Sequence, residues 1–150
     1  MTALVQFEHV TKQYGSKKAL DDISFTIEPG KIYGLLGPNG SGKTTLIKIA
    51  NGLLQPTNGR ILLDGREPGQ ITKSYISYLP DTNYLPAWMN VDSLLEMFKD
   101  FYGDFDIQKA REMLSQLNLQ GRERLRALSK GNKEKVQLIL AMSRAAKLYL

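Results

Sequence analysis

One stretch of eight residues combines the residue types and the spacing that bind a nucleotide phosphate. It fits the pattern Gly-x-x-x-x-Gly-Lys-[Ser/Thr]. Its glycines allow backbone N–H groups to turn inward around phosphate oxygens, and a helix that begins there adds the positive end of its dipole. The residues are Gly37, Pro38, Asn39, Gly40, Ser41, Gly42, Lys43 and Thr44. The sequence therefore predicts a phosphate-binding loop.

Each polar residue at the end of this loop has a predicted role. Lys43 is expected to bridge the β- and γ-phosphates, and the Thr44 hydroxyl to ligate a Mg²⁺ ion that bridges the same phosphates. Thr45 is expected to support the α-phosphate. A glycine-rich turn of purely structural use is the alternative, but the full match to the pattern disfavours it. Kinases, GTPases, helicases and transport ATPases share such a loop, so the loop alone does not identify the reaction.

The composition excludes several other classes of protein. A chain of 150 residues that is 42% hydrophobic is expected to form one domain with subdivisions. It has no cysteine, which excludes disulfides and thiolate metal sites. The net charge is +5, but basic and acidic residues are interspersed, so no nucleic-acid partner is expected. The N-terminus does not resemble a signal peptide, and no apolar run approaches the roughly 20 residues of a membrane span.

The hydrophobic pattern places the loop between a strand and a helix. Residues 4–11 and 23–27 alternate between polar and apolar types, which predicts half-buried strands. The short apolar run 31–36 predicts a strand that leads into the loop. Residues 43–54 predict a helix with an apolar face formed by Leu46, Ile49, Ala50 and Leu53.

Two further strands and a turn are predicted after that helix. Residues 60–63 predict a strand that ends in the turn dipeptide Asp64-Gly65. Residues 75–79 predict another strand, which ends at Pro80.

The period of the pattern then changes to that of helices. Asn90 is predicted to cap a helix with Val91, Leu94, Leu95 and Phe98 on one face. Asp106 is predicted to cap a second helix, with Ile107, Ala110, Leu114 and Leu117 on one face. A third helix, after Ser129, carries Val136, Ile139 and Leu140, and residues 147–150 predict the start of a strand.

The stretch Leu128-Ser129-Lys130-Gly131-Asn132 resembles the signature motif of ABC transporter nucleotide-binding domains, which normally reads Leu-Ser-Gly-Gly-Gln. It departs from that motif at Lys130 and Asn132. Tyr14, followed by a glycine, resembles the aromatic residue that stacks on adenine in this family. The stretch 76–81 is similar to the family's Q-loop, with Asp81 in the usual place of glutamine.

The resemblance implies how these residues act. Ser129, Gly131 and Asn132 would contact the γ-phosphate held by another protomer, so that two ATP molecules lie inside a head-to-tail homodimer or heterodimer. Ser129 supplies a hydroxyl there, and the following helix directs free N–H groups at the anion. Asp81 would reach the Mg²⁺, as the family's glutamine does, although a carboxylate only accepts hydrogen bonds.

The fold implied is an α/β P-loop NTPase of the ABC type, with an N-terminal antiparallel β subdomain, a helical subdomain insertion and an incomplete central sheet. The expected parts are a β subdomain and P-loop core at about 1–85, a helical subdomain at about 86–128, and the signature helix with the start of a strand at 129–150. In the family, that strand leads into an aspartate and a glutamate that serve hydrolysis. Because these acids are absent, no catalytic residue beyond Asp81 is predicted, and the chain is expected to bind nucleotide more readily than it hydrolyses it.

The function implied is that of the ATP-binding subunit of an ABC transporter, which binds ATP and Mg²⁺. Its expected partners are a polytopic membrane subunit and a second ATP-binding domain, and its expected location is peripheral, at the cytoplasmic face of the membrane. Two alternatives stay open at the level of sequence. One is a soluble ABC-type ATPase that acts on ribosomes or DNA, and the other is an ATP sensor that does not hydrolyse its ligand.

Overall fold

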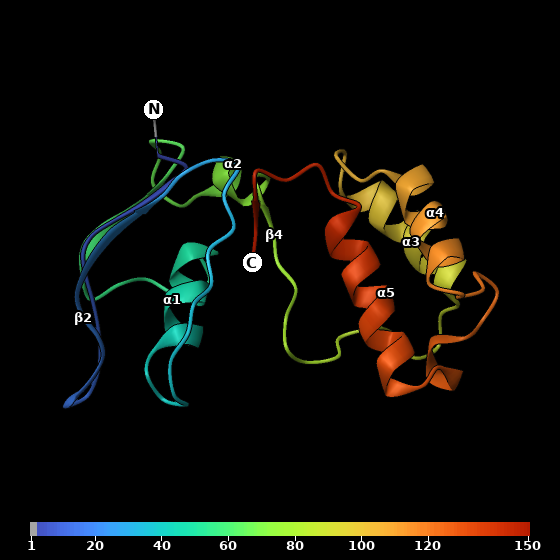
Figure 1. The fold of residues 1–150 in the computed structure, drawn as a ribbon, viewed down its shortest axis with the longest axis horizontal. Helices are drawn as coiled ribbons and strands as arrows, with labels where there is room; N and C mark the ends of the chain where they lie inside the picture. Colours follow the sequence, from blue (N-terminus) through green and yellow to red (C-terminus); the bar gives the residue numbers. More distant parts are fainter. Residues whose placement is uncertain (1–2) are drawn as a thin grey trace. The chain divides into compact units, whose positions relative to one another are not determined.

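The computed structural model describes residues 3–150, which form two compact units (Figure 1). The first unit, the β unit, contains residues 3–76 together with Leu150, and the second, the helical unit, contains residues 77–149. The mixed α/β character agrees with the predicted fold class. The three-part division predicted from the sequence stays a prediction.

A three-stranded antiparallel sheet forms the β unit. Strand β1 (Val5–Tyr14) lies in the centre, between β2 (Lys17–Ile27) and β3 (Asn58–Leu63). Opposite charges face each other across one of these pairs, because Arg60 Nε donates to Glu8 Oε2 at 2.6 Å, a hydrogen bond that raises the pKa of Arg60. Both N-terminal strands were predicted, but each is longer than the alternating pattern indicated.

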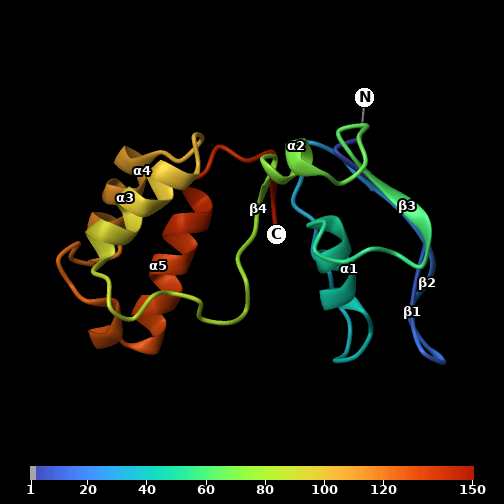
Figure 2. The ribbon, with the colours of Figure 1, turned by 180° about the vertical axis from the view of Figure 1, so that it is seen from behind.

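The first helix packs on this sheet. Helix α1 (Lys43–Ala50) lies on one side of the strands (Figure 2), and Leu46, Ile49 and Ala50 are buried, as predicted. Leu53 is not part of this apolar face, because the helix ends before it and its side chain is 60% exposed. Gly52, with φ 66°, turns the chain away from the helix axis, a common way for helices to end.

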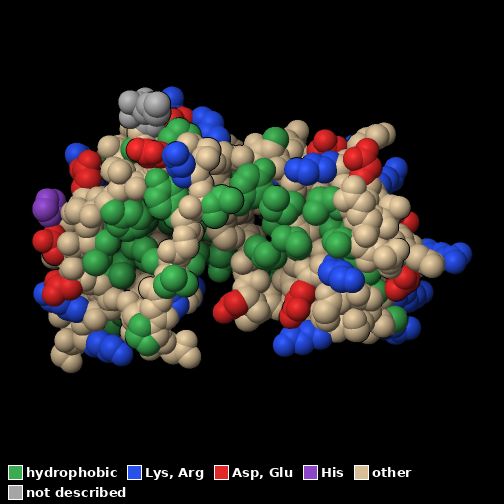
Figure 3. All heavy atoms as spheres, viewed as in Figure 1, with side chains coloured by type: hydrophobic (Ala, Val, Ile, Leu, Met, Phe, Trp, Pro, Cys, Tyr) green, Lys and Arg blue, Asp and Glu red, His purple; other side chains and the backbone are tan. Residues whose placement is uncertain are grey.

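The prediction of a strand over residues 31–36 was wrong for the structure described. This segment has no regular secondary structure, and the side chains of Ile32 and Leu36 are 102% and 92% exposed. An extended segment becomes a strand only by hydrogen bonding to a neighbour, and the sheet of the β unit consists of β2, β1 and β3. Figure 3 shows hydrophobic side chains at the surface of the β unit, and the large exposed ones in its part of the chain include Ile32, Tyr33, Leu35, Leu36, Leu53 and Ile71.

The end of the β unit has the predicted turn and a short helix. Asp64 and Gly65, with φ 51° and 74°, form the tight turn, in which Leu63 and Arg66 exchange two backbone hydrogen bonds. Helix α2 (Gln70–Lys73) follows. The next predicted strand is shorter than expected: β4 (Ile76–Ser77) pairs with β5 (Leu148–Tyr149) in a two-stranded sheet.

Three helices build the helical unit around one apolar cluster. They are α3 (Val91–Phe101), α4 (Ile107–Gln116) and α5 (Lys130–Met142), and a 3₁₀ turn, η1 (Leu125–Ala127), precedes the last. The side chains of Asn90 and Asp106 cap α3 and α4 as predicted, and the Ser129 side chain caps α5, each by accepting from a backbone N–H group. The fully buried members of the cluster are Val91, Leu94, Leu95, Ala110, Leu125, Val136, Ile139 and Leu140. Among residues 3–150, no helix has both the length and the apolar character to cross a membrane.

An ion pair joins the buried Arg144 side chain to Asp104, whose side chain is 29% exposed, within the helical unit. The Arg144 side chain is 8% exposed, and its Nε and Nη2 donate to the two carboxylate oxygens of Asp104 at 3.0 and 2.9 Å. The guanidinium carbon also lies 4.1 Å from the centroid of the Tyr102 ring. Two backbone hydrogen bonds connect the same two segments: Asp106 N donates to Ser143 O, and Ala145 N donates to Asp104 O. The pair thus connects the chain after α5 to the turn between α3 and α4.

Replacing Asp104 should destabilise the protein strongly. Asp104→Ala would leave the buried Arg144 charge without its carboxylate, and breaking a buried pair in this way typically costs about 3 kcal/mol or more. Urea denaturation, followed by circular dichroism, should show a lower transition midpoint. Asp100→Ala is the control, because that acid lies exposed on α3. Equal midpoints for the two variants would contradict the role of the ion pair.

Candidate functional site

The predicted phosphate-binding loop leads directly into α1. Ser41 N donates to Pro38 O at 3.2 Å, which closes a tight turn, and Gly40 has φ 83°. Gly42, with φ 95°, is the N-cap of α1 and provides no side chain to its first turn. The first N–H groups of a helix have no partner within it, so those that follow Gly42 are available to an anion.

Gly42 also lies directly against β2. A Cβ atom at this position would lie 2.3 Å from Ala19 O and 2.9 Å from Leu20 Cδ2. Only glycine combines this close approach with a left-handed backbone. The start of α1 is therefore set against the hairpin of β1 and β2.

Lys43 lies folded over the loop. Its Nζ donates to Gly37 O at 2.6 Å and to Pro38 O at 2.7 Å, with Ser41 Oγ at 3.4 Å. These oxygens hold the ammonium group above the turn. The positive charge is thus placed where the loop would receive phosphate.

A cavity of about 320 Å³ opens beside the loop and brings together residues from three elements. Tyr14 from the end of β1 lines the same cavity as Lys43 from α1, and the Tyr14 ring is half exposed, with Lys12 Nζ 5.3 Å from its centroid. No carboxylate lines the cavity. The lining residues are Tyr14, Lys17, Ala19, Asn39, Gly40, Gly42, Lys43, Thr44 and Thr45. The sequence had suggested neither Lys17 nor Ala19, because both reach the cavity only through the pairing of β2 with β1.

The donors at the loop fit Mg²⁺ only together with a phosphate ligand. Thr44 lines the cavity and offers a hydroxyl oxygen, a ligand that suits a hard cation. In the described part of the chain, no group of three or more His, Cys, Asp or Glu side chains could hold a metal. Phosphate oxygens would therefore have to supply further ligands.

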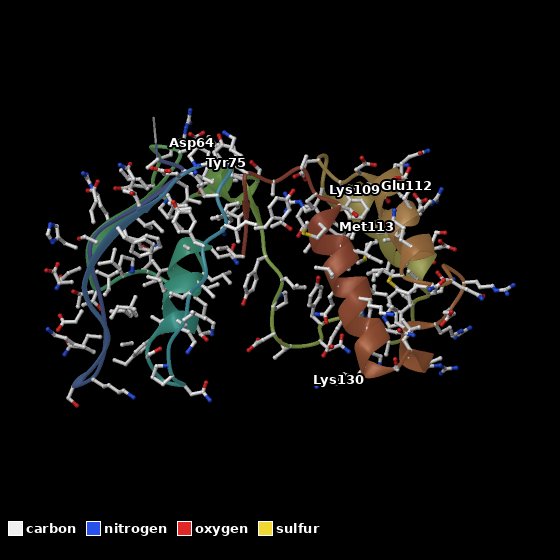
Figure 4. The ribbon with its side chains drawn as sticks, viewed as in Figure 1. Asp64, Tyr75, Lys109, Glu112, Met113 and Lys130 are labelled. Carbon is white, nitrogen blue, oxygen red and sulfur yellow. The ribbon has the colours of Figure 1, made fainter. Side chains whose placement is uncertain are left out.

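The signature residues lie at the start of α5, in the helical unit. Ser129 Oγ accepts from Asn132 N at 3.2 Å, so the serine caps the helix with the predicted hydroxyl. A Cβ atom at Gly131 would meet nothing within 4 Å, which leaves the backbone there open to approach. Lys130 marks the N-terminal end of the helix in Figure 4. Asp81, also in this unit, is exposed and follows β4.

All predicted loop residues and Tyr14 belong to the β unit, and most of them line one cavity, whereas Gly37, Pro38 and Ser41 do not line it. The other predicted site residues, Asp81, Ser129, Gly131 and Asn132, belong to the helical unit. Because Thr44 and Asp81 lie in different units, the shared metal site predicted for them stays a prediction.

Comparison with known proteins identifies the protein family to which this chain belongs. The sequence profile of the ABC transporter family matches residues 20–150. The chain belongs to the ABC transporter family. In Bacillus subtilis, the ABC transporter ATP-binding protein YtrB is 31% identical over 142 residues, which cover 93% of this chain and 49% of YtrB. The SkfA peptide export ATP-binding protein SkfE of the same organism is 33% identical over 153 residues, covering 98% of this chain and 64% of SkfE.

A relative from another organism and the solved structures agree with this family. The lipopolysaccharide export system ATP-binding protein LptB of Haemophilus influenzae is 31% identical over 159 residues, covering 99% of this chain and 66% of LptB. The solved ATP-binding subunit of an ABC transporter superposes with a TM-score of 0.87 at 25% identity, over 97% of this chain and 64% of that one. The fold is thus that of an ABC ATPase domain. The chain spans between about half and two thirds of the length of these relatives.

Substitution of Gly42 should disrupt the loop more than substitution of Gly40. Gly42→Ala would force a methyl group into Ala19 O, whereas a Cβ at Gly40 meets nothing within 4 Å. We expect Gly42→Ala to lower the free energy of unfolding by about 3 kcal/mol, and Gly40→Ala, which has only an unfavourable φ, by about 1 kcal/mol. Urea denaturation of both variants measures this difference. Equal losses would show that the approach to β2 does not position the loop.

Proposed function

We propose that this chain is the ATP-binding part of an ABC transporter and that it binds the nucleotide in the cavity beside the loop. The observation that supports this best is that Tyr14 lines one cavity together with residues of the loop and of the start of α1. These residues are Asn39, Gly40, Gly42, Lys43, Thr44 and Thr45. An aromatic ring and a phosphate cradle in one cavity match the two ends of a nucleoside triphosphate. A purely structural turn would not need the ring.

Each loop residue would contact a different part of the triphosphate. Backbone N–H groups at the start of α1 bind phosphate oxygens, and Lys43 exchanges its loop carbonyls for the β- and γ-phosphates. Thr45 supports the α-phosphate. Thr44 would hold Mg²⁺, with Asp81 as a further contact, and the ion would supply positive charge between phosphate oxygens.

The signature residues would act on the nucleotide of a second copy, or of a related domain. Ser129 Oγ accepts the Asn132 N–H at the first turn of α5, which leaves the serine hydroxyl hydrogen to donate, and Gly131 leaves the backbone N–H groups of this turn uncovered. These donors suit the γ-phosphate held by another protomer. We therefore propose a head-to-tail dimer with two nucleotides between the subunits.

The further partner is a polytopic membrane subunit, and the location is peripheral, at the cytoplasmic face of the membrane. The relatives SkfE and LptB, named as ATP-binding proteins of export systems, support a transport role. We infer that the 150-residue chain binds nucleotide more readily than it hydrolyses it, since the residues that line the cavity beside the loop include no carboxylate that could polarise water.

Removing the Lys43 charge should abolish most nucleotide binding. Lys43→Ala loses a charge-assisted contact with phosphate, so the Kd for a fluorescent ATP analogue with Mg²⁺ should rise at least about tenfold. Lys48→Ala, on the exposed side of the same helix, is the matched control and should bind like the unaltered chain. Equal Kd values for all three proteins would refute the site.

Tyr14 should contribute to the binding of the base and not to the binding of phosphate. Stacking of a base on an aromatic ring is typically worth about 1–3 kcal/mol, so Tyr14→Ala should weaken ATP binding about tenfold while Tyr14→Phe preserves it. Isothermal titration with ATP and with inorganic tripolyphosphate separates the two ends of the ligand. A loss of affinity for tripolyphosphate in Tyr14→Ala would contradict stacking and point to a change in the loop.

A further inference from the structure

The segment that contains Asp81 is attached to α5 at both of its ends. At one end, Ser77 Oγ donates to Ala141 O at 2.8 Å. At the other end, Gln137 Nε2 donates to Thr82 O at 3.0 Å. Ser77 is 3% exposed and Gln137 4%, so the hydrogen bond of Ser77 is buried, and that of Gln137 runs from a buried amide to the carbonyl of the exposed Thr82. Figure 2 traces this part of the chain from β4 towards α3.

The two attachment points are one helical turn apart on α5. Gln137 and Ala141 are four residues apart, and positions with this spacing lie above one another on the same face of a helix. Residues 77–82 are therefore held along that face at two levels. Asp81 immediately precedes the residue whose carbonyl Gln137 binds.

The chemistry of Gln137 indicates that it does more than fill space. Its neighbours on the buried side of α5 are Val136, Ile139 and Leu140, all fully buried and apolar. A buried amide that lost its partner would be costly, whereas an apolar side chain of the same size would fill the position without that cost. The Gln137 amide is therefore buried without a free-energy penalty only while it is hydrogen-bonded to Thr82 O.

Ser77 forms its hydrogen bond at the C-terminal end of α5. Ala141 lies in the last turn of α5, where carbonyl groups lack partners further along the helix. The Ser77 hydroxyl donates to one of these groups, Ala141 O, which also accepts from Arg144 N at 3.5 Å, while Ser129 accepts from an N–H group of the first turn. The same helix therefore begins at the signature serine and holds the Asp81 segment near its end.

We infer that Gln137 is a positioning residue that attaches the Asp81 segment to the signature helix, so that Asp81 and Ser129 move as parts of one body. Its functional meaning rests on the proposed function, in which Asp81 contacts the metal region and Ser129 the phosphate of the other protomer. A displacement at Asp81 is then passed to Ser129 through α5. A free loop would absorb it instead.

Spin labels can test this attachment cleanly, because the chain has no cysteine. Thr82→Cys keeps the backbone carbonyl that Gln137 binds, and Glu112→Cys places the second label on α4, where Glu112 lies exposed (Figure 4). Double electron–electron resonance on the 150-residue chain should give a narrow distance distribution. With Gln137→Met added, which keeps the size but removes the donor, the distribution should broaden.

Amide hydrogen exchange provides a second test of the attachment, with the Gln137→Met variant and without spin labels. The loss of one hydrogen bond changes an opening equilibrium by about fivefold, so the amides of residues 78, 79 and 81–83 should exchange about five times faster in Gln137→Met. The melting temperature should stay unchanged, because methionine fills the buried position. Gln108→Met, at an exposed position of α4, is the matched control and should change neither measurement.

An unchanged distance distribution in a folded Gln137→Met protein overturns the inference. If that variant does not fold, Gln137→Leu removes the same donor with another apolar side chain, and an unchanged distribution in that protein overturns the inference equally. These measurements need no nucleotide, so they are independent of the ATP-binding experiments. Failure of Lys43→Ala to affect binding would refute the proposed function and leave the attachment standing.

Discussion

The close approach of Gly42 to the carbonyl group of Ala19 determines how the β unit can bind a ligand. A side chain at this position would collide with the backbone of β2, so the start of α1 can lie against the hairpin only because glycine is there. The hairpin in turn carries Tyr14 at the end of β1. One contact between two backbones thus places an aromatic ring and the free N–H groups of a helix on the same cavity.

The helical unit depends on polar contacts that surround an apolar cluster. Its three helices begin at the capping residues Asn90, Asp106 and Ser129. The ion pair of Arg144 with Asp104 joins the chain after α5 to the turn between α3 and α4. Packing of the apolar residues alone would allow the connecting segments many arrangements. The directional contacts select one of them, and this is what gives the signature serine a defined position.

The sequence predicted the features that depend on near neighbours. The caps at Asn90 and Asp106 could be predicted because a cap acts within three residues, and the turn at Asp64 because its backbone preference is local. The strand over 31–36 was predicted wrongly because a strand also needs a partner, which a hydrophobic run does not reveal.

Long-range contacts were beyond the reach of sequence patterns. The bond of Gln137 to Thr82 spans 55 positions and the pair of Arg144 with Asp104 spans 40, so no local spacing indicates either. Lys17 joins the candidate site in the same manner, through strand pairing. Tyr14 was predicted at the site only because it resembles the residue that stacks on adenine in this family. The residues around Tyr14 do not by themselves indicate a nucleotide-binding role.

The two departures from the family signature lie where the fold does not need the side chain. The cap of α5 uses the hydroxyl of Ser129 and the backbone N–H of Asn132, so the side chain at position 132 takes no part in it. The Lys130 side chain is 93% exposed, and its contact with Glu134, one turn along the helix, has an N–O distance of 3.9 Å. Exposed pairs of this kind contribute little to stability. The substitutions therefore leave the helix start intact, and what they alter is the chemistry that the signature presents to its ligand.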